Sequence, residues 1–197
     1  MKTASPTVWG LRHARSLANE WMARPGNEWG SPTFRDDSSL VDARILQDES
    51  PSPLELPIDR ILVSPLTRCL QTWEATGLTN VPVLAHPLLT ERVYTASDTG
   101  RSVAELKQEF PDVDFSLVED EWWYTGSDHD DEWRPHGEDQ WYAVPGEPEA
   151  VFDARMERLK EYLSAQDDRL LLVTHWGVLR ALTGNDDIPH AQVLRLL

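Results

Sequence analysis

The chain has 197 residues, of which 40% are hydrophobic and 26% charged, a composition that allows a globular domain with a substantial buried core. No apolar run approaches the ~20 residues that a membrane-spanning helix needs, so we expect no membrane partner. The net charge of −16 argues against nucleic acid as a partner, because proteins that bind it usually carry a basic patch.

Short apolar runs alternate with helical patterns along the chain, and no repeat or low-complexity linker divides it. The first half predicts a strand at 7–11, a helix at 16–23, mostly loop at 25–57 with a short helix near 38–47, and a strand at 58–63. A helix at 65–76, a strand at 81–85 and a helix at 102–110 follow. The rest predicts irregular structure at 111–146, a helix at 147–165, a strand at 170–174 and a helix at 178–183.

Each predicted strand is apolar almost throughout, which is typical of a sheet covered by helices on both faces. Strands that alternate with helices favour parallel pairing. The sequence therefore predicts an α/β three-layer sandwich with a mostly parallel central sheet, formed as a single domain over residues 1–197. In such sheets ligands bind beyond the carboxyl ends of the strands.

Polar clusters follow three of the predicted strands at that edge: Arg12-His13, the segment 64–68, and Thr174-His175. A phosphate ester is a dianion, and an attacking nucleophile needs cations around its oxygens. Arg12 and Arg68 have the guanidinium groups for this. Neighbouring positive charge favours the neutral imidazole that His13 would need as a nucleophile.

Four blocks resemble the histidine phosphatase superfamily, the phosphoglycerate-mutase-like proteins. Residues 11–16, Leu-Arg-His-Ala-Arg-Ser, are similar to its Arg-His-Gly motif, and residues 63–72 to its Ser-Pro-Leu-x-Arg-x-x-x-Thr block. Residues 89–92 resemble the block with the catalytic acid, and residues 173–182 the final His-Gly block. The blocks occur in the family's order and span residues 8–184. The segments 97–101 and 110–115 further resemble a little-characterised branch of these proteins.

The resemblance implies roles for six residues. His13 would be the phosphorylated nucleophile, and Glu91 the general acid that protonates the leaving alkoxide. The residues implied to bind the phosphoryl group are Arg12, Arg68 and His175, with Asn19 as a further contact. No metal and no cofactor are implied. The chain departs from the family pattern at Ala14, Arg15 and Trp176, of which Trp176 puts a large ring near the mouth of the pocket.

The expected function is hydrolysis of a small-molecule phosphomonoester through phospho-His13. One alternative is a phosphoglycerate mutase, although 197 residues leave limited room for the inserted segments of such enzymes. Two others are a phosphohistidine-protein phosphatase and a module that binds phosphorylated ligands without turnover. The presence of His13 and Glu91 argues against the binding module.

Other groups of residues carry weaker signals. The acidic stretch 119–139 is expected to be a solvated loop, and the histidines and carboxylates at 129–136 lack regular metal-ligand spacing. Trp122, Trp123, Trp133 and Trp141 are expected either to cover the pocket or to pack on the sheet. His86 and His190 are interpreted as structural. The single cysteine, Cys69, is expected to pack in the core. Because one cysteine cannot form an internal disulfide and no secretory signal precedes Arg12, we expect a cytoplasmic protein.

Overall fold

The computed structural model describes residues 7–27, 38–46, 51–126 and 146–196. Its five strands are β1 (Val8–Arg12), β2 (Arg60–Val63), β3 (Val83–Ala85), β4 (Leu170–Thr174) and β5 (Val193–Arg195). Its α-helices are α1 (Leu17–Met22), α3 (Thr67–Ala75), α4 (Val103–Glu109), α5 (Glu149–Ser164) and α6 (Trp176–Thr183). Short 3-10 helices lie at Ser38–Leu40, Pro87–Leu89 and Ala96–Asp98. None of the described helices is long and apolar enough to cross a membrane.

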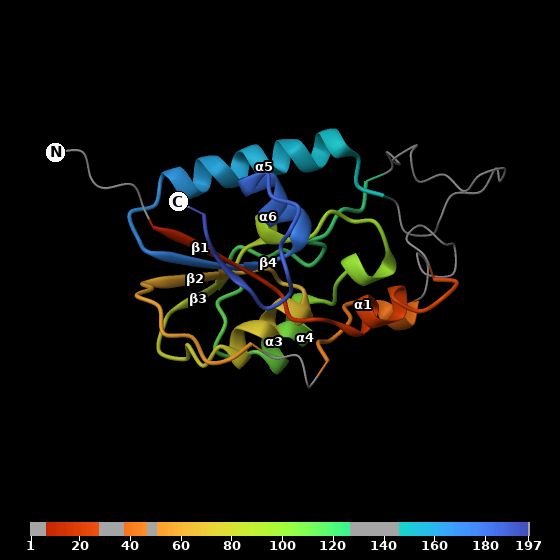
Figure 1. Cartoon of the computed structure of the whole chain (residues 1–197), viewed down its shortest axis with the longest axis horizontal. Helices are drawn as coiled ribbons and strands as arrows, with labels where there is room; N and C mark the ends of the chain where they lie inside the picture. The colour runs from red at the N-terminus through yellow and green to blue at the C-terminus, as the bar shows by residue number, and fades with distance from the viewer. Residues whose placement is uncertain (1–6, 28–37, 47–50, 127–145, 197) are drawn as a thin grey trace.

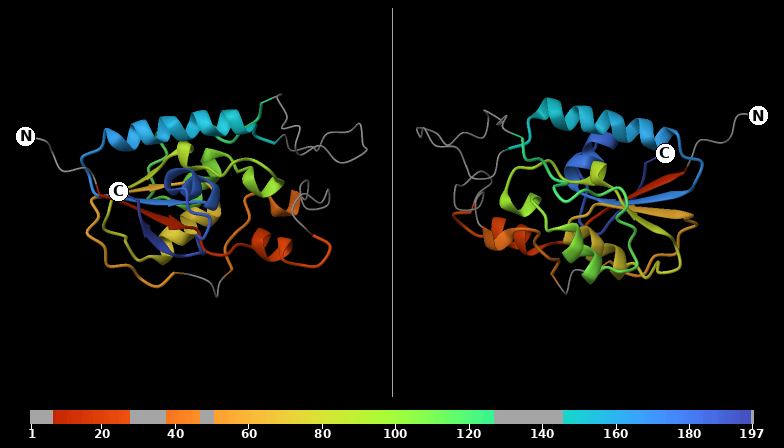
Figure 2. Two further views of the ribbon diagram at one scale, coloured as in Figure 1. Left: turned by 45° about the horizontal axis from the view of Figure 1, so that its top comes forward. Right: turned by 180° about the vertical axis from the view of Figure 1, so that it is seen from behind.

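The strands form one sheet in the order β3-β2-β4-β1-β5. The first four are parallel, and β5 pairs antiparallel with β1. Helices α5 and α6 lie on one face of the sheet and α3 and α4 on the other (Figures 1 and 2). The predicted α/β sandwich with a mostly parallel sheet is therefore confirmed. The sequence interpretation missed β5, and the predicted helix near 38–47 is only the 3-10 turn at 38–40.

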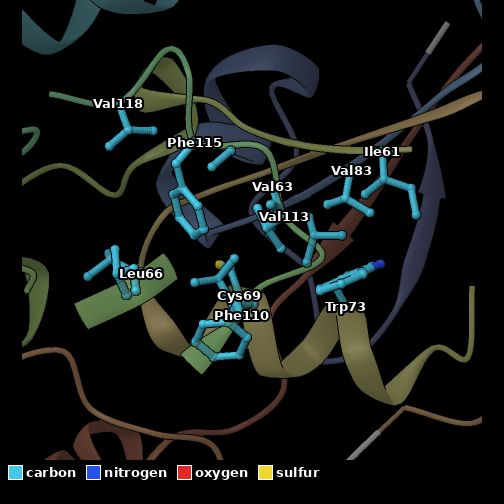
Figure 3. Close-up of a cluster of buried hydrophobic side chains, with 14 of the residues drawn as sticks. Ile61, Val63, Leu66, Cys69, Trp73, Val83, Phe110, Val113, Phe115 and Val118 are labelled. Carbon is cyan, nitrogen blue, oxygen red and sulfur yellow. The ribbon is translucent and has the colours of Figure 1, made fainter. Parts of the chain in front are cut away.

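Alternation along the central strands divides the core into two clusters, because successive side chains of a strand point to opposite faces. Ile61 and Val63 pack toward α3 and α4, whereas Leu62 packs toward α5 and α6. The first cluster also holds Cys69 with aromatic side chains of α3 and of the chain around α4 (Figure 3). Cys69 thus packs in the core, as predicted.

Residues far apart in sequence meet at the carboxyl edge of the sheet because of strand register. Arg12 pairs with Thr174 across β1 and β4, and Val63 pairs with Val173 across β2 and β4. The residues that follow β1, β2 and β4 therefore lie side by side at this edge of the sheet. The N–H of His13 still donates to Thr174 O at 2.8 Å, so this pairing continues one residue past β1.

Helix α3 begins beside this edge with a cap from a distant residue. Asp42 accepts from the backbone N–H of Thr67 at 2.6 Å and also bonds the Thr67 hydroxyl. Arg101 donates to the same carboxylate at 2.7 Å. A carboxylate at a helix N-terminus satisfies otherwise unpaired N–H groups. This cap fixes the start of the helix that carries Arg68.

Candidate active site

His13 lies just beyond β1 with only 5% of its surface exposed. Its Nδ1 is 2.7 Å from Ala14 O, and because a carbonyl oxygen only accepts, Nδ1 carries the proton. Nε2 therefore holds the lone pair. Burial lowers the pKa of His13 well below its usual value, and the charge of Arg68 lowers it further. The ring is thus neutral near pH 7, the state in which Nε2 can act as a nucleophile.

Two guanidinium groups border the same cavity as His13. Arg12 donates from Nη1 to Ile188 O at 2.6 Å, and its buried Nε has no hydrogen-bond partner among the described residues. Burial lowers the pKa of Arg12 while Glu91 raises it. Arg68 donates to Ser97 O at 2.5 Å and to Asp98 Oδ1 at 3.0 Å. These anchors hold both cations at the cavity and leave N–H groups for an anion.

His175 lies beneath these side chains rather than on the cavity wall. It is fully buried, its ring centroid is 5.1 Å from that of His13, and the two rings meet edge to face. Its Nδ1 accepts from Arg68 Nε at 3.3 Å, so its Nε2 is the protonated nitrogen and faces Ser64 Oγ at 2.8 Å. In this arrangement His175 contacts the cavity through Arg68, and a direct bond to a phosphoryl group remains a prediction.

Glu91 reaches the cavity from the segment after the 3-10 helix at 87–89. Its Oε1 accepts from the backbone N–H of Arg92 at 2.9 Å, and its Oε2 from that of Gly177 at 3.2 Å. Burial raises the pKa of Glu91, and the carboxylate of Asp98 raises it further. A carboxyl group that keeps its proton to higher pH suits a general acid.

Asn19 lines the cavity from the first turn of α1. Its Oδ1 accepts from the Ser16 N–H at 3.0 Å and from Ser16 Oγ at 2.9 Å, while the Ser16 side chain caps the helix. This reciprocal arrangement is a capping box and fixes the side chain of Asn19. Its amide NH2 group is what remains to contact a ligand.

A buried ion pair that the sequence did not reveal holds the segment of Glu91. Arg155 on α5 makes a bidentate contact with Glu147, with distances of 3.1 and 2.8 Å. Its remaining N–H groups donate to the carbonyl oxygens of Leu88, Thr90 and Glu91 at 3.2, 2.8 and 3.3 Å. Arg155 therefore ties α5 to the backbone on both sides of the candidate acid.

The two remaining described histidines differ in their surroundings. His86 accepts from the Leu88 N–H at 3.2 Å and contacts the Tyr162 ring, which agrees with a structural role. His190, also interpreted as structural, contacts the candidate nucleophile: the centroid of its ring is 5.5 Å from that of the His13 ring. Burial lowers the pKa of His190 to about 4, and Arg12 contributes. A lone histidine in a loop gives no sequence signal for this contact.

The aromatic and acidic region lies partly within the described residues. Trp122 packs in the core and donates from Nε1 to Arg101 O at 3.1 Å, so it does not cover the pocket. Trp123 contacts it edge to face. Trp133, Trp141 and the cluster at 129–136 lie outside the described residues. Among the described residues no cluster of three or more histidine, cysteine or acidic side chains is arranged to hold a metal.

The cavity itself has a volume of about 720 Å³ and opens between α1, α5, α6 and the segment 91–98. Five of the six residues singled out from the sequence border it, and His175 lies behind them. A neutral histidine with an available nitrogen, two guanidinium groups and a carboxyl with a raised pKa meet at its base. These groups are suited to attack on a bound phosphoryl group.

Solved structures share this fold at low sequence identity. A protein from Escherichia coli K-12, provisionally assigned as an alpha-ribazole-5′-P phosphatase, matches with a TM-score of 0.55 and 20% identity, over 96% of this chain and 89% of that one. Phosphoglycerate mutase from Thermus thermophilus matches with a TM-score of 0.53 and 18% identity, over 97% and 98%. The Rv3214 protein from Mycobacterium tuberculosis matches with a TM-score of 0.51 and 18% identity, over 96% and 90%. These similarities show the phosphoglycerate-mutase-like fold.

Comparison of the sequence with curated proteins and with family models identifies the family of this protein. No curated protein matches the chain. The family model described as the histidine phosphatase superfamily, branch 1, matches residues 52–186. That range includes Arg68, Glu91 and His175, whereas the block with Arg12 and His13 precedes it. Since the matched range is more than half of the chain, this protein belongs to branch 1 of the histidine phosphatase superfamily.

Proposed function

We propose that this protein is a phosphatase that hydrolyses phosphomonoesters through a covalent phosphohistidine on His13. The observation that carries the proposal is the orientation of the His13 ring. The bond from Nδ1 to Ala14 O leaves the Nε2 lone pair available, and burial keeps the ring neutral. Arg12 and Arg68 border the same cavity and can neutralise phosphoryl oxygens.

In the first step, Nε2 of His13 attacks phosphorus while the bond from phosphorus to the leaving oxygen breaks. Glu91 gives its proton to that oxygen, and the alcohol departs. Such proton donation contributes about 10²–10⁴-fold to a rate when the leaving group is a basic alkoxide. The hydrogen bonds of Glu91 to the N–H groups of Arg92 and Gly177 hold its carboxyl group in position.

In the second step, water attacks the phosphorus of phospho-His13 and gives a proton to the Glu91 carboxylate. The bond from phosphorus to Nε2 breaks, inorganic phosphate leaves, and the lone pair returns to Nε2. Glu91 is then protonated again, so the cycle closes. Arg68 acts through both steps from a position that Ser97, Asp98 and His175 fix.

Phosphate release from a panel of alkyl monophosphates tests the proposal. The His13→Ala variant should lose nearly all release while its circular dichroism and unfolding transition stay close to those of the unmodified protein. His86→Asn is the matched control, because asparagine can still accept the bond from the Leu88 N–H at this 3-10 helix cap. It should retain activity.

The alternatives give different results in the same assay. A phosphoglycerate mutase would interconvert phosphoglycerate isomers with little phosphate release. A binding module would retain a phosphorylated ligand and release nothing. Undiminished phosphate release by His13→Ala would refute the proposed nucleophile.

A further inference from the structure

The cavity is much larger than a phosphate group requires. Cavities of about 300–1,000 Å³ typically hold whole drug-sized molecules, and this one measures about 720 Å³. Arg12, His13, Arg68 and Glu91 occupy its base. The space beyond them must therefore receive the alcohol part of the substrate, and its walls show which alcohols fit.

Apolar side chains form much of these walls. They come from helices α1, α5 and α6 and from the segment after Glu91, all of which border the cavity. The residues are Ala18 and Met22 of α1, Phe152 and Met156 of α5, Trp176 and Ala181 of α6, and Tyr94. Contact with such side chains favours an apolar or aromatic group, because apolar surface gains by leaving water.

A row of carboxylates runs beside the apolar residues of α5. Glu149, Asp153 and Glu157 are spaced four residues apart, so they lie on one face of the helix and line the cavity. Lys160 is the basic residue of α5 on this wall, and its ammonium is 2.7 Å from Glu157. The α5 wall is therefore negative overall.

The other cations of the outer cavity are engaged within the protein. Arg180 donates to Asp186 at 2.5 Å and lies over the Trp176 ring at 5.4 Å. Arg92 donates to Glu147 O at 2.8 Å and lies over the Tyr94 ring at 4.8 Å. Among the described arginines that border the cavity, Arg12 and Arg68 are those whose charges act on His13, so we place the phosphate beside them.

We infer that the substrate is the monophosphate of a bulky apolar or aromatic alcohol that carries no second anionic group. This inference rests on the proposed function and narrows its substrate class. A second phosphate or a carboxylate would lie against the acidic row of α5, and juxtaposed like charges oppose binding. A hydrocarbon or aromatic group would instead contact the apolar walls.

Two primary alkyl phosphates with opposite outer groups test the inference. In 2-phenylethyl phosphate and 3-phosphoglycerate the leaving group is an alkoxide, so a difference in kcat/KM reports chiefly on the outer cavity. We expect kcat/KM to be at least about 10-fold higher for 2-phenylethyl phosphate, in line with the discrimination that a few apolar contacts provide.

A charge reversal on α5 separates the acidic row from general effects. Asp153→Lys should raise kcat/KM for 3-phosphoglycerate at least about 10-fold relative to 2-phenylethyl phosphate, since it replaces a negative side chain of the wall by a positive one. Glu161→Lys makes the same change in net charge on α5 outside the cavity, and should leave the ratio nearly unchanged.

The outcomes distinguish this inference from the function on which it rests. Equal or faster turnover of 3-phosphoglycerate, still abolished by His13→Ala, would overturn the substrate class and leave the phosphatase in place. An equal response of Asp153→Lys and Glu161→Lys would overturn the role of the acidic row. No release from either substrate, together with no phosphate on His13, would overturn both the function and the inference.

Discussion

Replacing Arg155 tests whether the buried pair with Glu147 supports the candidate site. Methionine keeps an unbranched stem of similar length but removes the guanidinium. Arg155→Met would leave the carboxylate of Glu147, which is 2% exposed, without its partner. It would also remove the donors to the carbonyl oxygens of Leu88, Thr90 and Glu91. Removing one partner of a buried ion pair typically costs about 3–5 kcal/mol, so we expect a loss of this size in the free energy of unfolding.

Urea unfolding followed by tryptophan fluorescence measures this loss. Arg169→Met is the matched control, because Arg169 pairs with Asp59 at 2.6 Å on the exposed surface, where solvent screens the charges. It should change the unfolding midpoint far less. Adding Glu147→Gln to Arg155→Met should restore part of the stability, since it removes the uncompensated charge. A loss below about 1 kcal/mol for Arg155→Met would refute the reasoning, because that is the size expected of an exposed pair.

Three further predictions concern Glu91 and its surroundings. Glu91→Gln should slow hydrolysis of an alkyl phosphate by about 10²-fold or more and that of an aryl phosphate much less, because a phenolate leaves without a proton; equal losses would assign Glu91 a positioning role. In the unmodified protein kcat/KM for an alkyl phosphate should fall as pH rises through the raised pKa of Glu91, and Glu91→Gln should lack this alkaline limb. Gly177→Ala should also slow alkyl phosphates, because an added Cβ would lie 2.3 Å from Glu91 Oε1 and displace the carboxyl group. Unchanged turnover in Gly177→Ala would argue against the observed position of Glu91 as the active one.

The central sheet could be predicted because its strands carry a strong signal. Every residue of β4 is buried, and its first four residues are apolar, a pattern typical of strands in a sheet covered on both faces. β5 could not be predicted in the same way. It has three residues, all at least partly exposed, and it forms through pairing with the edge of β1, which lies far away in the sequence.

In the candidate site, too, some residues could be predicted from the sequence and others could not. Arg12, His13 and Arg68 directly follow strands or begin the next helix, so motif and position pointed to the same edge of the sheet. The contact of Arg155 with the segment of Glu91 joins residues more than sixty positions apart, and no local pattern indicates that the two meet. The ring of His190 reaches His13 only because the chain after α6 returns along β1.

The covalent intermediate is the most direct test of the proposed mechanism. Rapid acid-free quenching of the protein during turnover of a ³²P-labelled monophosphate, followed by peptide mapping, locates any phosphate bound to the chain. The account predicts label on His13 that survives alkali and is lost in acid, and no label in His13→Ala. Label on a serine or an aspartate, or steady turnover with no labelled histidine at any time point, would contradict it.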